Sequence, residues 1–282
     1  MPASGPRLPP GASDPRPVGG GDINEAYRVT LADGREAFVK TRREPIPGEY
    51  AAEAVGLAWL AEPGQVRTPA VLDQDESYLA LQWIERGSLS ADGAEQFGRG
   101  LAGTHLAGAR EFGAPPGAPR DTGFGSLRLP NDPAPDWPSF YGEQRLMPLL
   151  ALAGQRGAIS EAGARAVEAV CERLGELCGP PEPPARLHGD LWAGNVMAGA
   201  DGGAWLIDPS AYGGHREVDL AMLRLFGAPS ERIFEAYEAA APLAPGAPDR
   251  VALYQLAPLL VHAVLFGGSY GAAAERAARG YL

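Results

Sequence analysis

The most constraining feature of this 282-residue chain is a polar run from His188 to Asn195, followed at a distance by Asp208. Asp190 and Asn195 are close enough in sequence to lie on one loop. The chain between Asn195 and Asp208 is typical of a β-hairpin, because two short apolar runs flank a turn of Gly, Ala and Asp. A hairpin returns the chain to its starting point. We therefore expect Asp190, Asn195 and Asp208 to share one site.

The first third of the chain has the pattern of a small antiparallel sheet with one helix. Strand-like segments are expected at residues 26–31, 36–40, 66–72 and 78–84. Residues 49–60 favour a helix that ends before a Pro-Gly pair. Lys40 ends the second strand and Glu53 lies in the middle of the helix, where the two can form an ion pair. Glu49, one turn earlier on the same helix face, could serve instead.

Helical periodicity replaces the strand pattern near residue 85. Further helices are expected at residues 91–106, 160–178, 218–226, 231–240 and 249–266. Residues 110–138, dense in Gly, Pro and Asp, predict a long ordered loop of a kind that is often functional. We expect an α+β protein with a flexible, proline-rich leader (1–17), a small N-terminal sheet lobe with one helix (18–84) and a larger, mainly helical C-terminal lobe (85–282).

Net charge and cysteine content indicate which partners the protein can bind and in which cellular compartment it lies. The net charge of -11, without clustered Lys and Arg, excludes a nucleic-acid partner. Cys171 and Cys178 would lie roughly 10 Å apart in one helix, whereas a disulfide needs Cα atoms within about 7 Å. Free thiols and the lack of a signal peptide indicate a cytoplasmic protein. The apolar segment 251–266 is interrupted by polar residues and proline, so we expect no membrane span.

The polar residues match the requirements of phosphoryl transfer from ATP as the protein-kinase fold performs it. Asp190 would accept the proton of a hydroxyl nucleophile, and Asn195 and Asp208 would hold Mg²⁺. Lys40 would contact the ATP phosphates and be oriented by Glu53. An isolated His-x-Asp run more often caps a turn. Five such residues in register favour the kinase interpretation.

Two further segments would complete an ATP site, and each has a plain structural alternative. Residues 18–24 include Gly20 and Gly21, whose backbone N–H groups could approach phosphates. The run does not match G-x-G-x-x-G, and a simple entry turn to the first hairpin is the alternative. The hinge that pairs with adenine would consist of Gln82, Trp83 and Ile84. The sequence alone barely distinguishes a hinge at residues 82–84 from an ordinary buried strand.

The chain around Asp208 and Asp190 indicates a small acceptor. Only residues 209–218 separate Asp208 from Asp219, too few for the activation loop of a protein kinase. Trp192, two residues after Asp190, could stack on the apolar face of a sugar or polyol. A core tryptophan that braces the loop is an equal alternative.

With these motifs the chain resembles the fructosamine kinase (ketosamine 3-kinase) family, which is related to the aminoglycoside phosphotransferases. The strings H-G-D-L-W-x-G-N and G-x-R-E-x-D-L-A-M are the most specific carriers. The resemblance rests on residues 19–26, 38–40, 53–57, 140–146, 188–195, 214–222 and 254–262. Many relatives have a cysteine where Asp22 stands, so no redox switch is expected there.

The resemblance implies a two-lobed protein-kinase-like fold and ATP-dependent phosphorylation of the C3 hydroxyl of ketoamines, free or on protein lysines, which leads to deglycation. It implies that Trp192 and His262 contact the substrate and that Asp219 supports the catalytic loop. The cofactors would be ATP and Mg²⁺, and we expect a monomer. Two alternatives stay open: a phosphotransferase for an aminoglycoside, choline or a free sugar, and a catalytically silent protein with this fold.

Overall fold

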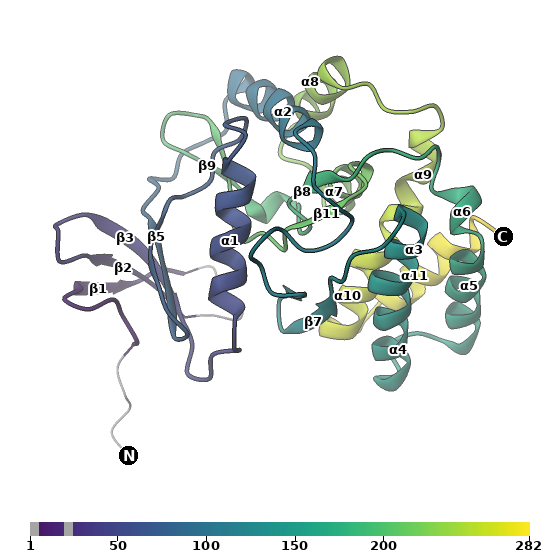
Figure 1. Ribbon diagram of the computed structural model, residues 1–282, viewed down its shortest axis with the longest axis horizontal. Coiled ribbons are helices and arrows are strands. Elements are labelled where there is room, and N and C mark those ends of the chain that lie inside the picture. Colours follow the sequence, from purple (N-terminus) through teal and green to yellow (C-terminus); the bar gives the residue numbers. More distant parts are fainter. Residues whose placement is uncertain (1–5, 20–24) are drawn as a thin grey trace.

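The structure, a computed structural model, describes residues 6–19 and 25–282. A small sheet lies on one side of helix α1 (Glu49–Ala61) and a larger helical body on the other (Figure 1). The five-stranded sheet has the order β1-β2-β3-β5-β4, and each neighbouring pair is antiparallel. Its strands are β1 (Ser13–Pro17), β2 (Glu25–Thr30), β3 (Glu36–Thr41), β4 (Val71–Gln74) and β5 (Tyr78–Gln82). The predicted sheet with one helix is confirmed, although β4 begins later than expected.

The two faces of the sheet bury different side chains, and this alternation orients Lys40. Ala37 and Val39 are fully buried on the outer face with side chains of β2 and β5. Phe38 packs on the opposite face, among residues of α1 and β5. Because side chains of a strand alternate between faces, Lys40 shares the face of Phe38 and points toward α1.

Residues 13–17, expected to belong to a flexible leader, instead form the edge strand β1. Ser13 lies opposite Thr30 and Pro17 opposite Tyr27, with a register shift between them. An edge strand has only one hydrogen-bonded neighbour, so prolines are tolerated where the N–H would face solvent. The expectation of a flexible leader is wrong for these residues.

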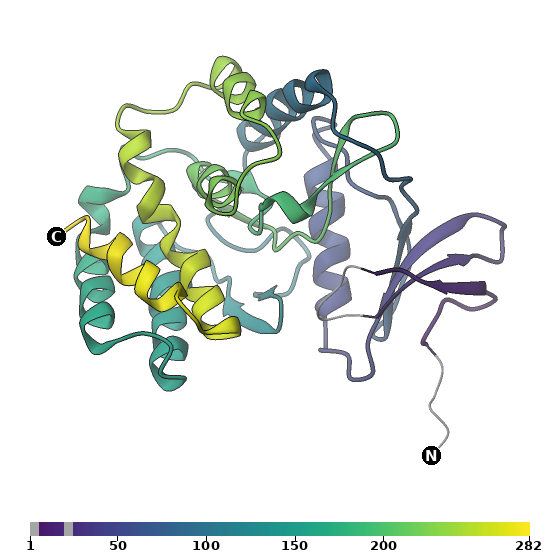
Figure 2. The same cartoon turned by 180° about the vertical axis from the view of Figure 1, so that it is seen from behind.

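The remainder is mainly helical, as expected (Figure 2). Its helices are α2 (Ala91–Leu106), α3 (Trp137–Tyr141), the π-helix η1 (Gly142–Leu146), α4 (Met147–Gln155), α5 (Glu161–Glu172), α6 (Leu174–Leu177), α7 (Glu217–Leu225), α8 (Arg232–Ala240), α9 (Ala247–Tyr254), α10 (Leu256–Phe266) and α11 (Tyr270–Arg279). One core lies among α3, η1, α4, α5, α10 and α11, and a second among α2, α7 and α8. The sheet ends at Gln82 and α2 begins at Ala91, and we propose the boundary between the lobes near Glu85.

Three two-stranded ribbons bring the polar motifs together. They are β6 (Asp121–Phe124) with β7 (Leu127–Pro130), β8 (Ala185–Leu187) with β11 (Tyr212–Gly214), and β9 (Val196–Ala198) with β10 (Ala204–Leu206). The β6–β7 hairpin lies inside the segment expected to be a long loop.

The cysteines and the apolar C-terminal stretch belong to the helical body. Cys171 lies in α5 and Cys178 follows α6, and both are free thiols. Burial raises the pKa of Cys171 to about 11 and that of Cys178 to about 12. Residues 247–266 are long and apolar enough for a membrane span, but 61% of their most apolar window is buried inside the structure. They form two core helices, α9 and α10.

Candidate active site

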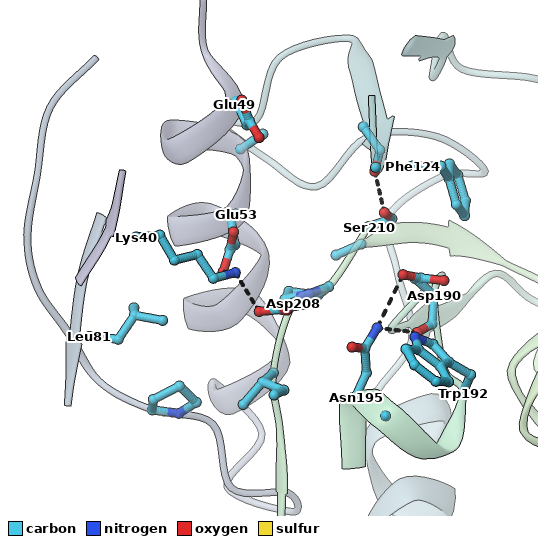
Figure 3. A pocket seen from close by; sticks show the side chains of 18 of the residues that line it. Lys40, Glu49, Glu53, Leu81, Phe124, Asp190, Trp192, Asn195, Asp208 and Ser210 are labelled. Carbon is cyan, nitrogen blue, oxygen red and sulfur yellow. Dashed lines mark hydrogen bonds and ion pairs between the residues drawn. The ribbon is translucent and has the colours of Figure 1, made fainter. Parts of the chain in front are cut away.

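A cavity of about 560 Å³ opens between the sheet and the helical body (Figure 3). It contains the predicted site residues that fall within the described chain. They are Lys40, Glu53, Gln82, Trp83, Ile84, Asp190, Trp192, Asn195, Asp208 and His262. Gly20, Gly21 and Asp22 lie outside the described residues. Residues far apart in sequence therefore meet around one space.

Lys40 lies at the sheet side of this cavity between two carboxylates. Its Nζ is 2.7 Å from Glu53 Oε1 and also contacts Asp208 Oδ1. Burial opposes the charge of Lys40, but the carboxylates of Asp208 and Glu53 outweigh it and raise the pKa of the ammonium. Glu49, the alternative partner, instead lies 3.0 Å from Arg42. The Lys40–Glu53 pair predicted from spacing is present.

Asp190 and Asn195 form a tight loop at the helical side. Asn195 belongs to the 3₁₀ turn η2 (Ala193–Asn195), and its Nδ2 donates to Asp190 O at 2.8 Å and Asp190 Oδ2 at 3.1 Å. Burial raises the pKa of Asp190 to about 7. The hydrogen bond from Asn195 opposes this rise, and the carboxylates of Asp208 and Asp219 add to it. The site concentrates negative charge that a cation would neutralise.

The β9–β10 hairpin returns Asp208 beside Asn195, as predicted. Val196 pairs with Leu206, and Ile207 N donates to Asn195 O at 3.1 Å. Asp208 itself has φ 55°, a left-handed conformation that costs a non-glycine residue roughly 1–2 kcal/mol. Strain of this kind persists where surrounding structure imposes it, and it often marks functional sites.

Asp219 supports the loop that carries Asp190, as the resemblance implied. Its fully buried carboxylate accepts hydrogen bonds from His188 N at 2.7 Å and Gly189 N at 2.9 Å, and it lies 3.2 Å from His105 Nε2. Gly189 has φ 82°, and a Cβ there would lie 2.1 Å from the carbonyl oxygen of Ser210. The loop needs both this glycine and this carboxylate to present Asp190.

Replacing Asp219 with Asn should destabilise the protein by roughly 2–4 kcal/mol, because one amide cannot accept both loop N–H groups without placing its own N–H₂ against a donor. Urea denaturation would measure the change. Asp201→Asn, a substitution of an exposed aspartate paired with Arg67, is the matched control and should shift stability by less than about 0.5 kcal/mol. Equal stabilities for the two variants would contradict the supporting role of Asp219.

Trp192 and His262 line another part of the cavity, and Phe226 packs against both of their rings. Trp192 is 41% exposed, its ring lies over Gly194, and its centroid is 6.5 Å from that of Phe226. Phe226 lies 4.7 Å from the ring of His262. His262 Nδ1 is 2.8 Å from Pro258 O, so Nδ1 carries the proton, and burial lowers the pKa of the ring. Nε2 of neutral His262 is then a hydrogen-bond acceptor.

Sequence reasoning missed several of these neighbours. Phe226 ends a helix and belongs to no motif, so no local pattern distinguishes it from a core residue. The β6–β7 region contributes Phe124, Arg128 and Asn131 to the cavity. Ser210 Oγ donates to the carbonyl of Gly123, which ties that hairpin to the chain just after Asp208. Only the composition of the loop indicated a function there.

The donor set suits magnesium better than a transition metal. Within residues 6–19 and 25–282, no three His, Cys, Asp or Glu side chains are grouped for metal binding. Asn195 uses Nδ2 toward Asp190, and its Oδ1, a hard oxygen, accepts no hydrogen bond from the described residues. Mg²⁺ takes such oxygens and completes its shell with water and substrate phosphates. Asn195 and Asp208 therefore fit a magnesium ion.

The sequence model of the fructosamine kinase family matches residues 10–282. The chain belongs to this family. A Thermobifida fusca protein of known crystal structure, named as a candidate fructosamine-3-kinase, is 45% identical with a TM-score of 0.89, over 95% of this chain and 93% of that one. A Thermus thermophilus protein named a probable ketoamine kinase is 39% identical, over 93% of this chain and 91% of its own.

More distant proteins of known structure share the fold. A macrolide 2′-phosphotransferase of type I has 16% identity and a TM-score of 0.59, over 94% of this chain and 90% of its own, which shows the fold alone. The expected two-lobed, protein-kinase-like α+β fold is confirmed. As a fructosamine kinase family member the protein is an enzyme, a kinase that transfers phosphate to a hydroxyl group.

Proposed function

We propose that the protein transfers the γ-phosphate of ATP to the C3 hydroxyl of ketoamines, the adducts that sugars form with amines. The phosphorylated adducts are labile, so the reaction removes the sugar. The observation that carries this proposal is the convergence of the Lys40–Glu53 pair with Asp190, Asn195 and Asp208 on one cavity in a fructosamine kinase family member.

The proposed roles follow from position and chemistry. Lys40, oriented by Glu53, binds the ATP phosphates, and Asp190 accepts the proton of the attacking hydroxyl. Asn195 and Asp208 hold Mg²⁺, which when bound neutralises charge on the phosphates. The hinge that receives adenine consists of Gln82, Trp83 and Ile84, and Gly20 and Gly21, outside the described residues, are assigned to ATP binding.

The acceptor lies at the aromatic end of the cavity. Trp192 offers a ring face to the apolar side of the sugar, and His262 Nε2 accepts a hydrogen bond from one of its hydroxyls. Trp192 is 41% exposed, so an amine substituent can extend into solvent. This openness supports both free ketoamines and glycated lysines of proteins as substrates. We further propose a cytoplasmic monomer.

A panel of acceptors tests the function. With ATP and Mg²⁺, ADP release should saturate with ribulosamine, erythrulosamine or fructosamine derivatives, and removal of Mg²⁺ by EDTA should abolish it. Aminoglycosides, choline and free sugars should give rates near the background without acceptor. Saturable turnover of an aminoglycoside, choline or a free sugar, with no turnover of ketoamines, would show that the proposed substrate is wrong. Magnesium-dependent ATP binding without turnover of any acceptor would contradict an enzymatic role.

A further inference from the structure

A buried arginine without a carboxylate partner lies behind the cavity. Arg145, in the π-helix η1, is 1% exposed, and none of the ion pairs among the described residues includes it. Its guanidinium carbon lies 4.6 Å from the ring centre of Phe140 and 4.1 Å from that of Tyr212. Burying an unpaired charge is costly. The contacts of the Arg145 guanidinium must therefore compensate for the solvation that it loses.

The polar contacts of Arg145 hold the end of β7. Nη1 donates to Pro130 O at 2.7 Å and to Gln144 O at 2.8 Å, and Nη2 donates to Asn131 Oδ1 at 2.6 Å. Nε has no partner. Asn131, whose side chain accepts the short hydrogen bond from Arg145, lines the cavity.

The guanidinium decides which way the Asn131 amide is turned. An arginine carries donors only, so the amide atom that faces it must be the oxygen. Asn131 is also fixed by its backbone, because its N donates to Arg120 O at 2.6 Å and its O accepts from Ala114 N at 3.0 Å. Asn131 Nδ2 donates to no described residue. Its two N–H donors remain available at the cavity wall.

Asn131 follows a hairpin that lies on the Asp190 side of the cavity. The hairpin that precedes it is tied to Ser210, and Figure 3 shows Phe124, Ser210 and Asp190 on the side opposite Lys40 and Leu81. Tyr212, on which Arg145 stacks, pairs with Leu187 just before the catalytic loop. Arg145 is thus packed against the strands that also carry Asp190.

We propose that Asn131 Nδ2 donates a hydrogen bond to an oxygen of the acceptor's sugar chain, and that Arg145 is the positioning residue that holds this amide in place. The inference rests on the proposed function, since it takes a ketoamine as the acceptor. An open-chain ketoamine has oxygens on both sides of C3, and a fixed donor there selects a polyoxygenated acceptor over an apolar alcohol. Discrimination of this kind is strong because an acceptor without the oxygen leaves the donor unpaired.

The variant Asn131→Asp separates this role from a structural one. Asp has the same shape, pairs with the unpaired Arg145 and removes the donor. We expect a thermal midpoint equal to or above that of the wild type, an unchanged KM for ATP, and a KM for the ketoamine raised roughly tenfold or more. Asp132→Asn, a one-charge change on the exposed neighbour, is the control and should leave the ketoamine KM within about twofold.

A second variant tests the positioning residue. Arg145→Lys keeps the charge but not the paired donors, so the amide loses its fixed orientation, and the ketoamine KM should rise while the ATP KM stays unchanged. An unchanged ketoamine KM in Asn131→Asp would overturn the inference. A lowered KM would also overturn it, because it would show that residue 131 faces the cationic amine of the ketoamine and not an oxygen of its sugar chain. Absence of ketoamine turnover in the wild type would overturn the proposed function and this inference together, whereas loss confined to the variants supports the inference.

Discussion

Asp190→Asn should lower kcat on ketoamines by about two to four orders of magnitude, the range expected when a positioned proton acceptor is removed. The amide keeps the shape of the carboxylate and can still interact with Asn195, but it cannot take the hydroxyl proton. The KM for ATP should change little, because Lys40, Glu53 and Asp208 are untouched. Steady-state ADP release at saturating ketoamine measures the effect.

Stability measurements separate this loss from misfolding. Burial raises the pKa of Asp190 to about 7, so the folded protein holds this carboxylate less favourably than the unfolded chain does at neutral pH. The neutral amide removes that penalty, and Asp190→Asn should melt no lower than the wild type. A variant that retains kcat within about threefold would refute the role of Asp190 as proton acceptor.

Lys40→Met should reduce kcat/KM for ATP by about 10² to 10³, the usual cost of removing one preorganised charge from a transferring phosphoryl group. It should also destabilise the protein by about 3 kcal/mol, because Glu53 would remain buried without its cation. ADP-release kinetics and urea denaturation measure the two effects. Glu53→Gln, which keeps the contact of Lys40 with Asp208, is expected to lose less activity.

The double variant Lys40→Met, Glu53→Gln completes a double-mutant cycle for the Lys40–Glu53 pair. If the two side chains form a coupled pair, the double variant should be more stable than Lys40→Met alone, because no buried carboxylate is left unpaired. Its activity should match that of Lys40→Met, since Glu53 acts only through Lys40. Additive effects on both stability and activity would contradict the pairing seen at 2.7 Å.

The convergence of Lys40, Glu53, Asp190, Asn195 and Asp208 could be predicted because its geometry is local. Asp190 and Asn195 are joined by one loop, and a two-stranded hairpin brings back Asp208, so spacing along the chain implies proximity in space. Lys40 and Glu53 lie on adjacent elements whose periodicities place them face to face. Here short-range rules of strand and helix geometry were sufficient.

Beyond Trp192 and His262, the surroundings of the proposed acceptor end could not be predicted in the same way. Phe226, Asn131 and Arg145 come from a helix end, a hairpin end and a π-helix, and no spacing rule relates them. The edge strand β1 was missed for a similar reason, since proline-rich composition describes a leader as well as it describes an edge strand. Such residues become neighbours only through packing of distant segments.

The sequence by itself determined that the protein transfers a phosphoryl group. It places a lysine, three carboxylates and an amide at spacings that strand, helix and hairpin geometry bring together. Only the tertiary structure decided how the acceptor end is built. There, Arg145 is buried against the rings of Phe140 and Tyr212 and donates to the amide oxygen of Asn131, while Asp219 ties the loop of Asp190 to α7. These arrangements depend on which buried donors and acceptors satisfy one another across distant segments, and that is settled when the core packs.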